Sequence, residues 1–333
     1  MRIVVTGCAG FIGSSLCKHL LKNGKKVVGI DNFLCGFKEN MEGFINEGMF
    51  EFHELNLNDK RITDIIQKDD IVIHLAAISS LPRNQENPYF SYENNVSSMA
   101  NLLEVCRFKG VKNVVFSSTS AIYENNDIFP LHENHDTKPN LLYSLGKKHC
   151  EELVKSFHDI YGLPYTTLRF FNVYGPNQDS KRTNPPLVPY LIDCYSNNII
   201  PILHSDGNQK RDYIFVDDIL ALFDILLEKD TSLNTEVNLC SGKVVSVKEI
   251  VELIKKGFNS NIEPLYRNPE LLWEKSNVLW EGNYIFSKER MKEEVIKYCI
   301  GSTAKAKELL NWETKIPLEE GIQKICMGYI SNT

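Results

Sequence analysis

Several kinds of segment are missing from this sequence of 333 residues. It contains no internal repeat, no low-complexity tract and no long hydrophobic run. Its first apolar stretch, 3–5, is far too short for a signal peptide or a membrane span. It also lacks an excess of basic residues, since its formal net charge is −6. Nucleic acid and anionic membranes are therefore not expected as its main partners.

The cysteines lack any pairing pattern. Their number, nine, is odd, their spacing is scattered, and no Cys-x-x-Cys pair occurs. This pattern argues against a zinc site and against a disulfide framework, so we expect no bound metal and a location in the reducing cytoplasm. A chain of this length also buries enough apolar surface to fold without such cross-links.

What the first half of the sequence does contain is an alternation of short apolar runs and helix-like stretches. Continuous apolar strands separated by helices are typical of a parallel sheet that is covered on both faces. We therefore predict an α/β fold, a Rossmann-type doubly wound parallel sheet, over residues 1–170. The predicted strands cover 3–5, 27–30, 71–75, 114–116 and 165–170, and the predicted helices cover 14–23, 95–108 and 142–161.

The second half is less regular. Residues 172–189 are rich in Pro and Asn and predict a loop. We predict a smaller, interleaved C-terminal α/β substrate domain over 171–333, with part of 212–240 joining the first domain. Helices are expected over 187–195, 216–227, 246–256, 301–312 and 318–329.

Three glycines follow the first predicted strand and open the first predicted helix. Gly7 permits a tight turn, Gly10 lets the backbone approach a diphosphate, and Gly13 lets the helix pack against the strand. Three glycines alone are equally consistent with a turn that binds nothing. Asp31, at the end of the next strand, favours a dinucleotide, because a carboxylate there binds the ribose hydroxyls. It also repels a 2′-phosphate, so the expected cofactor is NAD rather than NADP.

Tyr143 and Lys147 lie four residues apart, on one face of the helix predicted over 142–161. An ammonium group beside a phenol stabilises the phenolate and lowers the pKa of a tyrosine from about 10, which suits a general acid or base. The spacing alone decides little, because Tyr284 and Lys288 share it by chance.

Position distinguishes Tyr143 from Tyr284. Tyr143 begins a long helix after the strand that ends in Ser117-Ser118-Thr119, and doubly wound sheets bind ligands at the carboxyl ends of their strands. The Thr119 hydroxyl can bond the same substrate oxygen as Tyr143. A threonine that merely satisfies the end of a strand is the alternative interpretation.

These motifs form part of a longer series, which occupies 5–13, 31–32, 74–77, 95–96, 117–123, 143–147, 169–176, 211–213 and 216–218. In this order the series resembles the extended short-chain dehydrogenase/reductase family, which includes the NAD-dependent nucleotide-sugar epimerases and dehydratases. The resemblance implies that Thr119, Tyr143 and Lys147 are the catalytic residues. It also implies a homodimer formed through a four-helix bundle that includes the Tyr-Lys helix.

The resemblance further implies the ligand contacts. Besides Tyr143 and Lys147, the implied NAD-binding residues are Gly7, Gly10, Phe11, Ile12, Gly13, Asp31, Asn32, Asn56, Leu57, Leu75, Ala76, Ala77 and Phe170. Thr119, Tyr143, Asn172 and Arg211 are implied to bind the nucleotide sugar. Arg211 would hold its diphosphate, for which the planar fork of an arginine is suited. Two positions depart from the family, which often has Asp at Asn56 and Gly at Glu124.

The residues after Thr119 favour one branch of the family. Dehydratases carry Asp-Glu there to move protons, whereas this chain has Ser120 and Ala121, and alanine cannot transfer a proton. We therefore expect epimerisation at C4 of a UDP-hexose or UDP-N-acetylhexosamine through a 4-keto sugar. The alternatives are epimerisation at another carbon, a dehydratase or reductase of the same family, and a non-catalytic NAD-binding scaffold.

Two further residues bear on the sugar. Cys299 falls where 4-epimerases have a gate residue, and a small residue there admits an N-acetyl group; an ordinary buried cysteine is the alternative. An unusual segment, 271–293, precedes it and is expected to reshape the pocket. Arg83, in a predicted loop over 81–84, can contact a polar or charged sugar substituent, and a solvated loop arginine is equally consistent.

Overall fold

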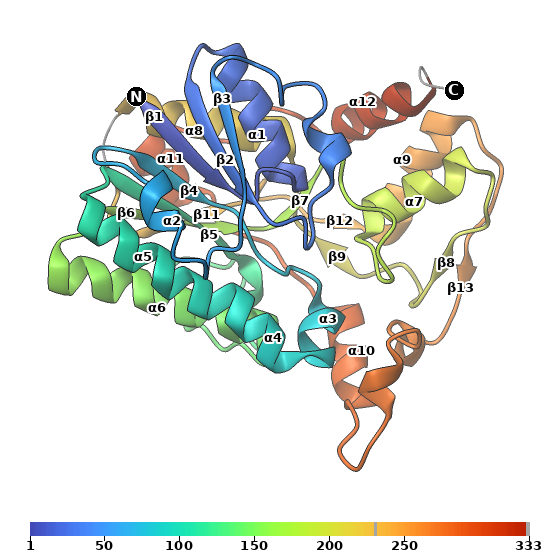
Figure 1. The fold of residues 1–333 in the computed structure, drawn as a ribbon. Helices are drawn as coiled ribbons and strands as arrows, with labels where there is room; N and C mark the ends of the chain where they lie inside the picture. The colour runs from blue at the N-terminus through green and yellow to red at the C-terminus, as the bar shows by residue number, and fades with distance from the viewer. Residues whose placement is uncertain (230–231, 331–333) are drawn as a thin grey trace.

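The computed structural model describes residues 1–229 and 232–330, and its centre is a seven-stranded parallel sheet (Figure 1). The strand order is β11-β6-β5-β4-β1-β2-β3, and every pair of neighbours is parallel. The predicted doubly wound sheet is confirmed. Its strands are β1 (Arg2–Thr6), β2 (Lys26–Asp31), β3 (Phe50–Glu54), β4 (Ile71–His74), β5 (Asn113–Thr119), β6 (Tyr165–Phe170) and β11 (Glu236–Leu239).

Helices cover both faces of the sheet, as its apolar strands require. Ile3 and Val5 pack into one core and Val4 into the other, because successive side chains of a strand point to opposite faces. The first face carries α1 (Phe11–Lys22), α8 (Val216–Lys229) and α11 (Ala304–Leu310). The second carries α2 (Ile62–Ile65), α5 (Ser98–Lys109) and α6 (Leu142–Tyr161).

The strongest predictions of secondary structure are confirmed. The helix predicted over 142–161 and the strand over 165–170 have the observed bounds of α6 and β6. The helix predicted over 95–108 begins as a π-helical turn, η2 (Glu93–Ser97), which continues into α5. Helix α8 (Val216–Lys229) packs on the main sheet and β11 (Glu236–Leu239) pairs with β6 at its edge.

The predicted loop over 172–189 is wrong at its start, because Asn172–Tyr174 forms strand β7, whose backbone pairs in parallel with β10 (Tyr213–Phe215). The helix predicted over 187–195 is confirmed as α7 (Leu187–Ser196). The smaller core beside the sheet combines α7 with α9 (Val247–Phe258) and α12 (Leu318–Ile330). Short strand pairs join β9 (Lys210–Arg211) to β12 (Val245–Ser246), and β8 (Ile202–Leu203) to β13 (Leu265–Tyr266).

A further group of short elements lies at the bottom of Figure 1. The predicted loop over 81–84 is wrong, because Pro82 starts a helix well and these residues form α3 (Leu81–Glu86), followed by α4 (Pro88–Tyr92). Residues 268–297, here called the cover segment, contain η4 (Pro269–Leu271), η5 (Asn277–Trp280) and α10 (Lys288–Ile296). Trp273 and Met291 of this segment are buried with Leu141, so the segment packs against the residue that precedes α6.

No helix within 1–229 or 232–330 combines the length and the apolar character that a membrane crossing needs. All nine cysteines carry free thiols, and only Cys35 is exposed.

Candidate active site

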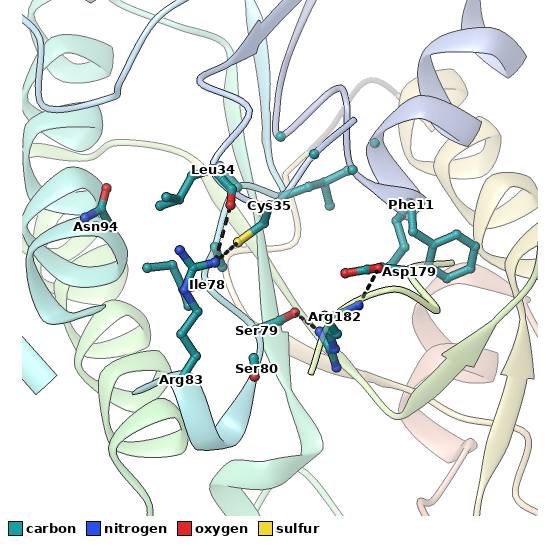
Figure 2. A pocket seen from close by; sticks show the side chains of 18 of the residues that line it. Phe11, Leu34, Cys35, Ile78, Ser79, Ser80, Arg83, Asn94, Asp179 and Arg182 are labelled. Carbon is teal, nitrogen blue, oxygen red and sulfur yellow. Dashed lines mark hydrogen bonds between the residues drawn. The ribbon is translucent and has the colours of Figure 1, made fainter. Parts of the chain in front are cut away.

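A cleft with a volume of about 820 Å³ opens at the carboxyl ends of the central strands (Figure 2). Both the dinucleotide-binding pattern and the Tyr-Lys pair predicted from the sequence contribute to its lining. The predicted site residues that line it are Gly7, Gly10, Phe11, Ile12, Gly13, Asp31, Asn32, Asn56, Leu57, Leu75, Ala76, Ala77, Arg83, Thr119, Tyr143, Lys147 and Phe170.

The glycine turn between β1 and α1 has no room for a side chain at Gly7 or Gly13. Gly7 has a φ of 73°, and a Cβ on it would lie 2.7 Å from the amide nitrogen of Ala76. A Cβ on Gly13 would lie 2.0 Å from the carbonyl oxygen of Gly7. Gly10, the N-cap of α1, has no side chain to accept hydrogen bonds from the first helical turn. The turn therefore presents the positive end of α1 to the cleft, which is a suitable place for phosphate.

Asp31 joins the next loop to this turn. Its Oδ2 accepts a hydrogen bond of 2.9 Å from the Ala9 amide, and its Oδ1 accepts one of 2.8 Å from the Phe33 amide. Burial raises the pKa of Asp31, although the hydrogen bonds from these amides oppose the rise. The carboxylate keeps unused acceptor capacity at the end of β2, where a ribose would lie.

Tyr143, Lys147 and Thr119 all line the cleft. Thr119 ends β5 and hydrogen-bonds the phenol of Tyr143, which lies in the first turn of α6. The Lys147 ammonium donates a hydrogen bond of 2.7 Å to the carbonyl oxygen of Ser117 and lies 4.9 Å from the centre of the Phe116 ring. Both contacts fix the ammonium group against the end of β5.

The electrostatics differ from the expectation for Tyr143. Burial raises the pKa of Tyr143 to about 12, outweighing the hydrogen bond from Thr119 and the positive charge of Arg182, which both lower it. Burial also lowers the pKa of Lys147 to about 8, against the raising effects of Cys150 and Glu151. Burial thus disfavours the charged form of each group, and positive charge in the cleft favours the phenolate.

Glu124 links the start of α6 to the cover segment. Its Oε2 accepts hydrogen bonds of 2.8 Å from the Ser144 hydroxyl and from the Asn140 amide. Its Oε1 accepts a hydrogen bond of 3.3 Å from the Lys297 ammonium and lies 3.6 Å from Nη2 of Arg290. The buried carboxylate at the position where the family often has Gly therefore connects the start of α6 to two cations of the cover segment.

The remaining sugar-binding candidates lie outside the cleft lining. Arg211 forms a backbone bridge with Cys299, and its Nη2 donates a hydrogen bond of 2.7 Å to the Glu294 carbonyl oxygen. The side-chain amide of Asn172 donates a hydrogen bond of 2.8 Å to the carbonyl oxygen of Asp212. The structure thus brings Arg211 and Cys299 together, and places Asn172 beside the residue that follows Arg211.

Comparison with known proteins gives this geometry its context. A model of the NAD dependent epimerase/dehydratase family matches residues 3–240. The chain belongs to this family. A UDP-glucuronate 4-epimerase from Thermodesulfobacterium geofontis is 32% identical, with 96% of this chain and 94% of the relative covered.

Solved structures of similar proteins agree with this assignment. A UDP-glucose 4-epimerase from Thermotoga maritima, solved with UDP-glucose, is 31% identical with a TM-score of 0.86, over 100% of this chain and 99% of the other. A UDP-N-acetylglucosamine 4-epimerase from Methanobrevibacter ruminantium, solved with UDP-N-acetylmuramic acid, is 29% identical with a TM-score of 0.87, with the same coverage.

As a member of the NAD dependent epimerase/dehydratase family, the chain is an enzyme that uses NAD. The cleft fits this cofactor, since the N-terminus of α1 begins at Gly10 without a capping side chain, and such a free helix end suits a diphosphate. Asp31 lies where the adenosine ribose of NAD would be bound.

Several cleft residues of this epimerase family member were missed from the sequence. Cys35, Ser79, Asp179, Arg182 and Ser276 all line the cleft. Asp179 and Arg182 lie in the segment predicted as a loop, to which no chemistry was assigned. The segment follows a strand at the carboxyl edge of the sheet, where loops form ligand sites. This position could have indicated that Asp179 and Arg182 belong to the site.

Proposed function

We propose that the chain epimerises a UDP-linked sugar at C4, with Tyr143 as the acid and base. The observation that carries the proposal is the convergence of a phenol, a hydroxyl and an ammonium group in the cleft beside the glycine turn. The presence of Ser120 and Ala121 after Thr119 supports epimerisation over elimination, because neither residue supplies a carboxyl group for proton transfer. The names of the similar enzymes, all UDP-sugar 4-epimerases, support the same carbon.

The chain's own groups have separate tasks in this reaction. Thr119 and Tyr143 bind the oxygen at C4, and Tyr143 takes its proton and later returns it. Lys147 favours the phenolate by its charge, from a position fixed by the Ser117 carbonyl. The chemistry that NAD supplies when bound is the acceptance and return of one hydride. For the hydride to return to the opposite face of C4, the sugar must turn while its nucleotide stays bound in place.

The anchor for the nucleotide is proposed to be Arg211, with Asn172 beside the sugar. The Arg211 guanidinium uses one nitrogen for the Glu294 carbonyl, and its other N–H donors can bind a diphosphate. Cys299 is a small residue at this place, which favours a pocket that admits UDP-N-acetylhexosamines as well as UDP-hexoses.

A cytoplasmic homodimer is part of the proposal. Large apolar side chains are exposed along α5 and α6, including Phe108 at 69% and Ile160 at 68% of their possible surface. Such an exposed apolar face favours burial against a second copy in a four-helix bundle. Sedimentation equilibrium should give twice the monomer mass, and a monomer would contradict this arrangement. The nine free thiols favour a reducing compartment.

The decisive experiment is incubation with a panel of UDP-sugars, with the products separated and the C4 configuration determined by NMR. We expect interconversion without net formation of NADH. Tyr143→Phe should reduce turnover by about 10²–10⁴-fold, because proton transfer by a positioned side chain contributes this much. Tyr284→Phe is the matched control, since Tyr284 belongs to the second Tyr-x-x-x-Lys sequence and is fully exposed. Stoichiometric NADH, or full activity of Tyr143→Phe, would contradict the proposal.

A further inference from the structure

Two arginines from different parts of the chain line the cleft (Figure 2). Arg83, on α3, reaches the loop after β2, where its Nη1 donates hydrogen bonds of 3.3 Å to the Leu34 carbonyl oxygen and 3.4 Å to the Cys35 sulfur. Arg182, in the segment after β7, directs its Nη1 to the Ser79 hydroxyl at 3.5 Å. Both guanidinium groups act on the Cys35 thiol, lowering its pKa against the larger effect of burial. In the view of Figure 2, the two arginines lie on either side of Cys35.

Neither arginine is neutralised in the part of the chain that the structure describes. The contacts of both guanidinium groups are with carbonyl, hydroxyl and thiol groups, without an ion pair to a carboxylate within 4.0 Å. The charge of Asp179 acts on Arg182, but the Asp179 Oδ1 accepts its hydrogen bonds from the amides of Lys181 and Arg182 rather than from the guanidinium. Burial lowers the pKa of Arg182, so its charge has lost solvation without gaining a full counter-charge.

The loop that Arg83 contacts is fixed onto the glycine turn. The Phe37 amide donates a hydrogen bond of 3.0 Å to the Ala9 carbonyl oxygen, and the Asn40 side-chain amide donates one of 2.9 Å to the same atom. Asp31 completes the connection through the Ala9 amide. Arg83 is thus held to the same structural unit as the N-terminus of α1, and Arg182 and the first turn of α1 line the same cleft.

We propose that Arg83 and Arg182 form a clamp that binds the diphosphate of NAD from the side opposite the glycine turn. The first turn of α1 provides backbone N–H groups on one side, and the two guanidinium forks provide charged donors on the other. Arg83 thereby has a cofactor partner instead of the sugar substituent expected from the sequence. The diphosphate of the nucleotide sugar is left to Arg211, which lies outside this cleft lining, against the cover segment.

Calorimetric titration of the full chain, freed of endogenous NAD, with ADP-ribose and with adenosine tests the clamp. Arg83→Gln and Arg182→Gln should each weaken ADP-ribose binding by about tenfold to a hundredfold, the range that corresponds to one or two charge-assisted hydrogen bonds. Adenosine, which has no phosphate, should bind each variant as it binds the parent protein. Arg182→Lys should recover part of the loss, because it keeps the charge but not the fork. As a second readout, NAD retained through gel filtration should fall in both glutamine variants.

Arg267→Gln is the control, because Arg267 is an arginine outside the cleft lining, with its side chain 46% exposed and 3.8 Å from Glu274. It should bind ADP-ribose like the parent protein. A titration with UDP separates the two possible diphosphates. If Arg182→Gln weakened UDP and left ADP-ribose unchanged, the clamp would be overturned in favour of a substrate contact. Equal weakening of adenosine and ADP-ribose would overturn it as well, because the effect would not depend on phosphate. None of these titrations requires epimerase activity, so their outcome is separate from that of the proposed function.

Discussion

The two sides of the cleft are built in different ways. The side formed by β1, α1 and β2 consists of regular elements, and its geometry comes from glycines and backbone amides that are neighbours in sequence. The other side, formed by residues 175–186 and by the cover segment, is held by side chains that are distant in sequence. The first side therefore tolerates no added atom in its turn, whereas the second should respond gradually to the loss of single contacts.

The largest effect is expected from Gly13→Ala on the regular side. The new Cβ would lie 2.0 Å from the Gly7 carbonyl oxygen, so the turn or the start of α1 must shift. We expect a loss of more than about 3 kcal/mol in the free energy of unfolding, as for severe overpacking, and almost no NAD in the purified protein. Chemical denaturation and absorbance of released NAD measure the two effects.

Gly43→Ala is the control for this change. A Cβ at Gly43 meets no atom within 4 Å, and its φ is not positive. Its stability and NAD content should match those of the parent protein. If Gly13→Ala kept the stability and the NAD content of the parent protein, the glycine turn would be more adaptable than its contacts indicate. The contrast between the two sides of the cleft would then disappear.

A moderate effect is expected from Glu124→Gln, which changes the residue that holds the cover segment to the start of α6. The substitution removes the buried negative charge between Lys297 and Arg290 while leaving its shape almost unchanged. The substitution leaves the charges of Lys297 and Arg290 without this counter-charge, which is costly in a buried place. We therefore expect the free energy of unfolding to fall by about 2 kcal/mol and the Tm to fall with it. The KM for the UDP-sugar should rise because the segment packs against the start of α6, while NAD content stays that of the parent protein.

The matched change for this cluster is Glu293→Gln. Glu293 also pairs with Arg290, at 3.7 Å, but its side chain is 59% exposed, so its ion pair should contribute little. The prediction requires Glu124→Gln to be clearly less stable than Glu293→Gln. Equal Tm values would mean that Glu124 does not fasten the cover segment.

The same contrast explains what the sequence could predict. The glycine turn, Asp31 and the Tyr143–Lys147 pair were predicted because each depends on local spacing within or beside one element. Residues 172–174 were wrongly assigned to a loop, since their strand depends on pairing with a segment that begins at Tyr213. The contacts of Arg182 with Ser79 and of Glu124 with Lys297 join residues 103 and 173 positions apart, a distance over which no periodic pattern extends.

The smallest effect is expected from His74, which lies buried at the end of β4. Its Nδ1 hydrogen-bonds the Thr6 hydroxyl at 2.8 Å. Burial, and then the nearby charge of Lys147, lower the pKa of His74 from 6.5 to about 3. Between these pH values the unfolded chain binds a proton at this residue that the folded chain excludes, so stability must fall as the pH falls below 6.5. From pH 6.5 to pH 5.5 the contribution is about 1 kcal/mol.

Denaturation at a series of pH values measures this contribution on the regular side of the cleft. His74→Gln should be less stable than the parent protein near pH 7, because a buried hydrogen bond is altered, but its stability should fall less steeply between pH 6.5 and pH 5. The parent protein is the comparison at each pH value. If the slope of His74→Gln equalled that of the parent protein, the acid sensitivity would have to come from groups other than His74.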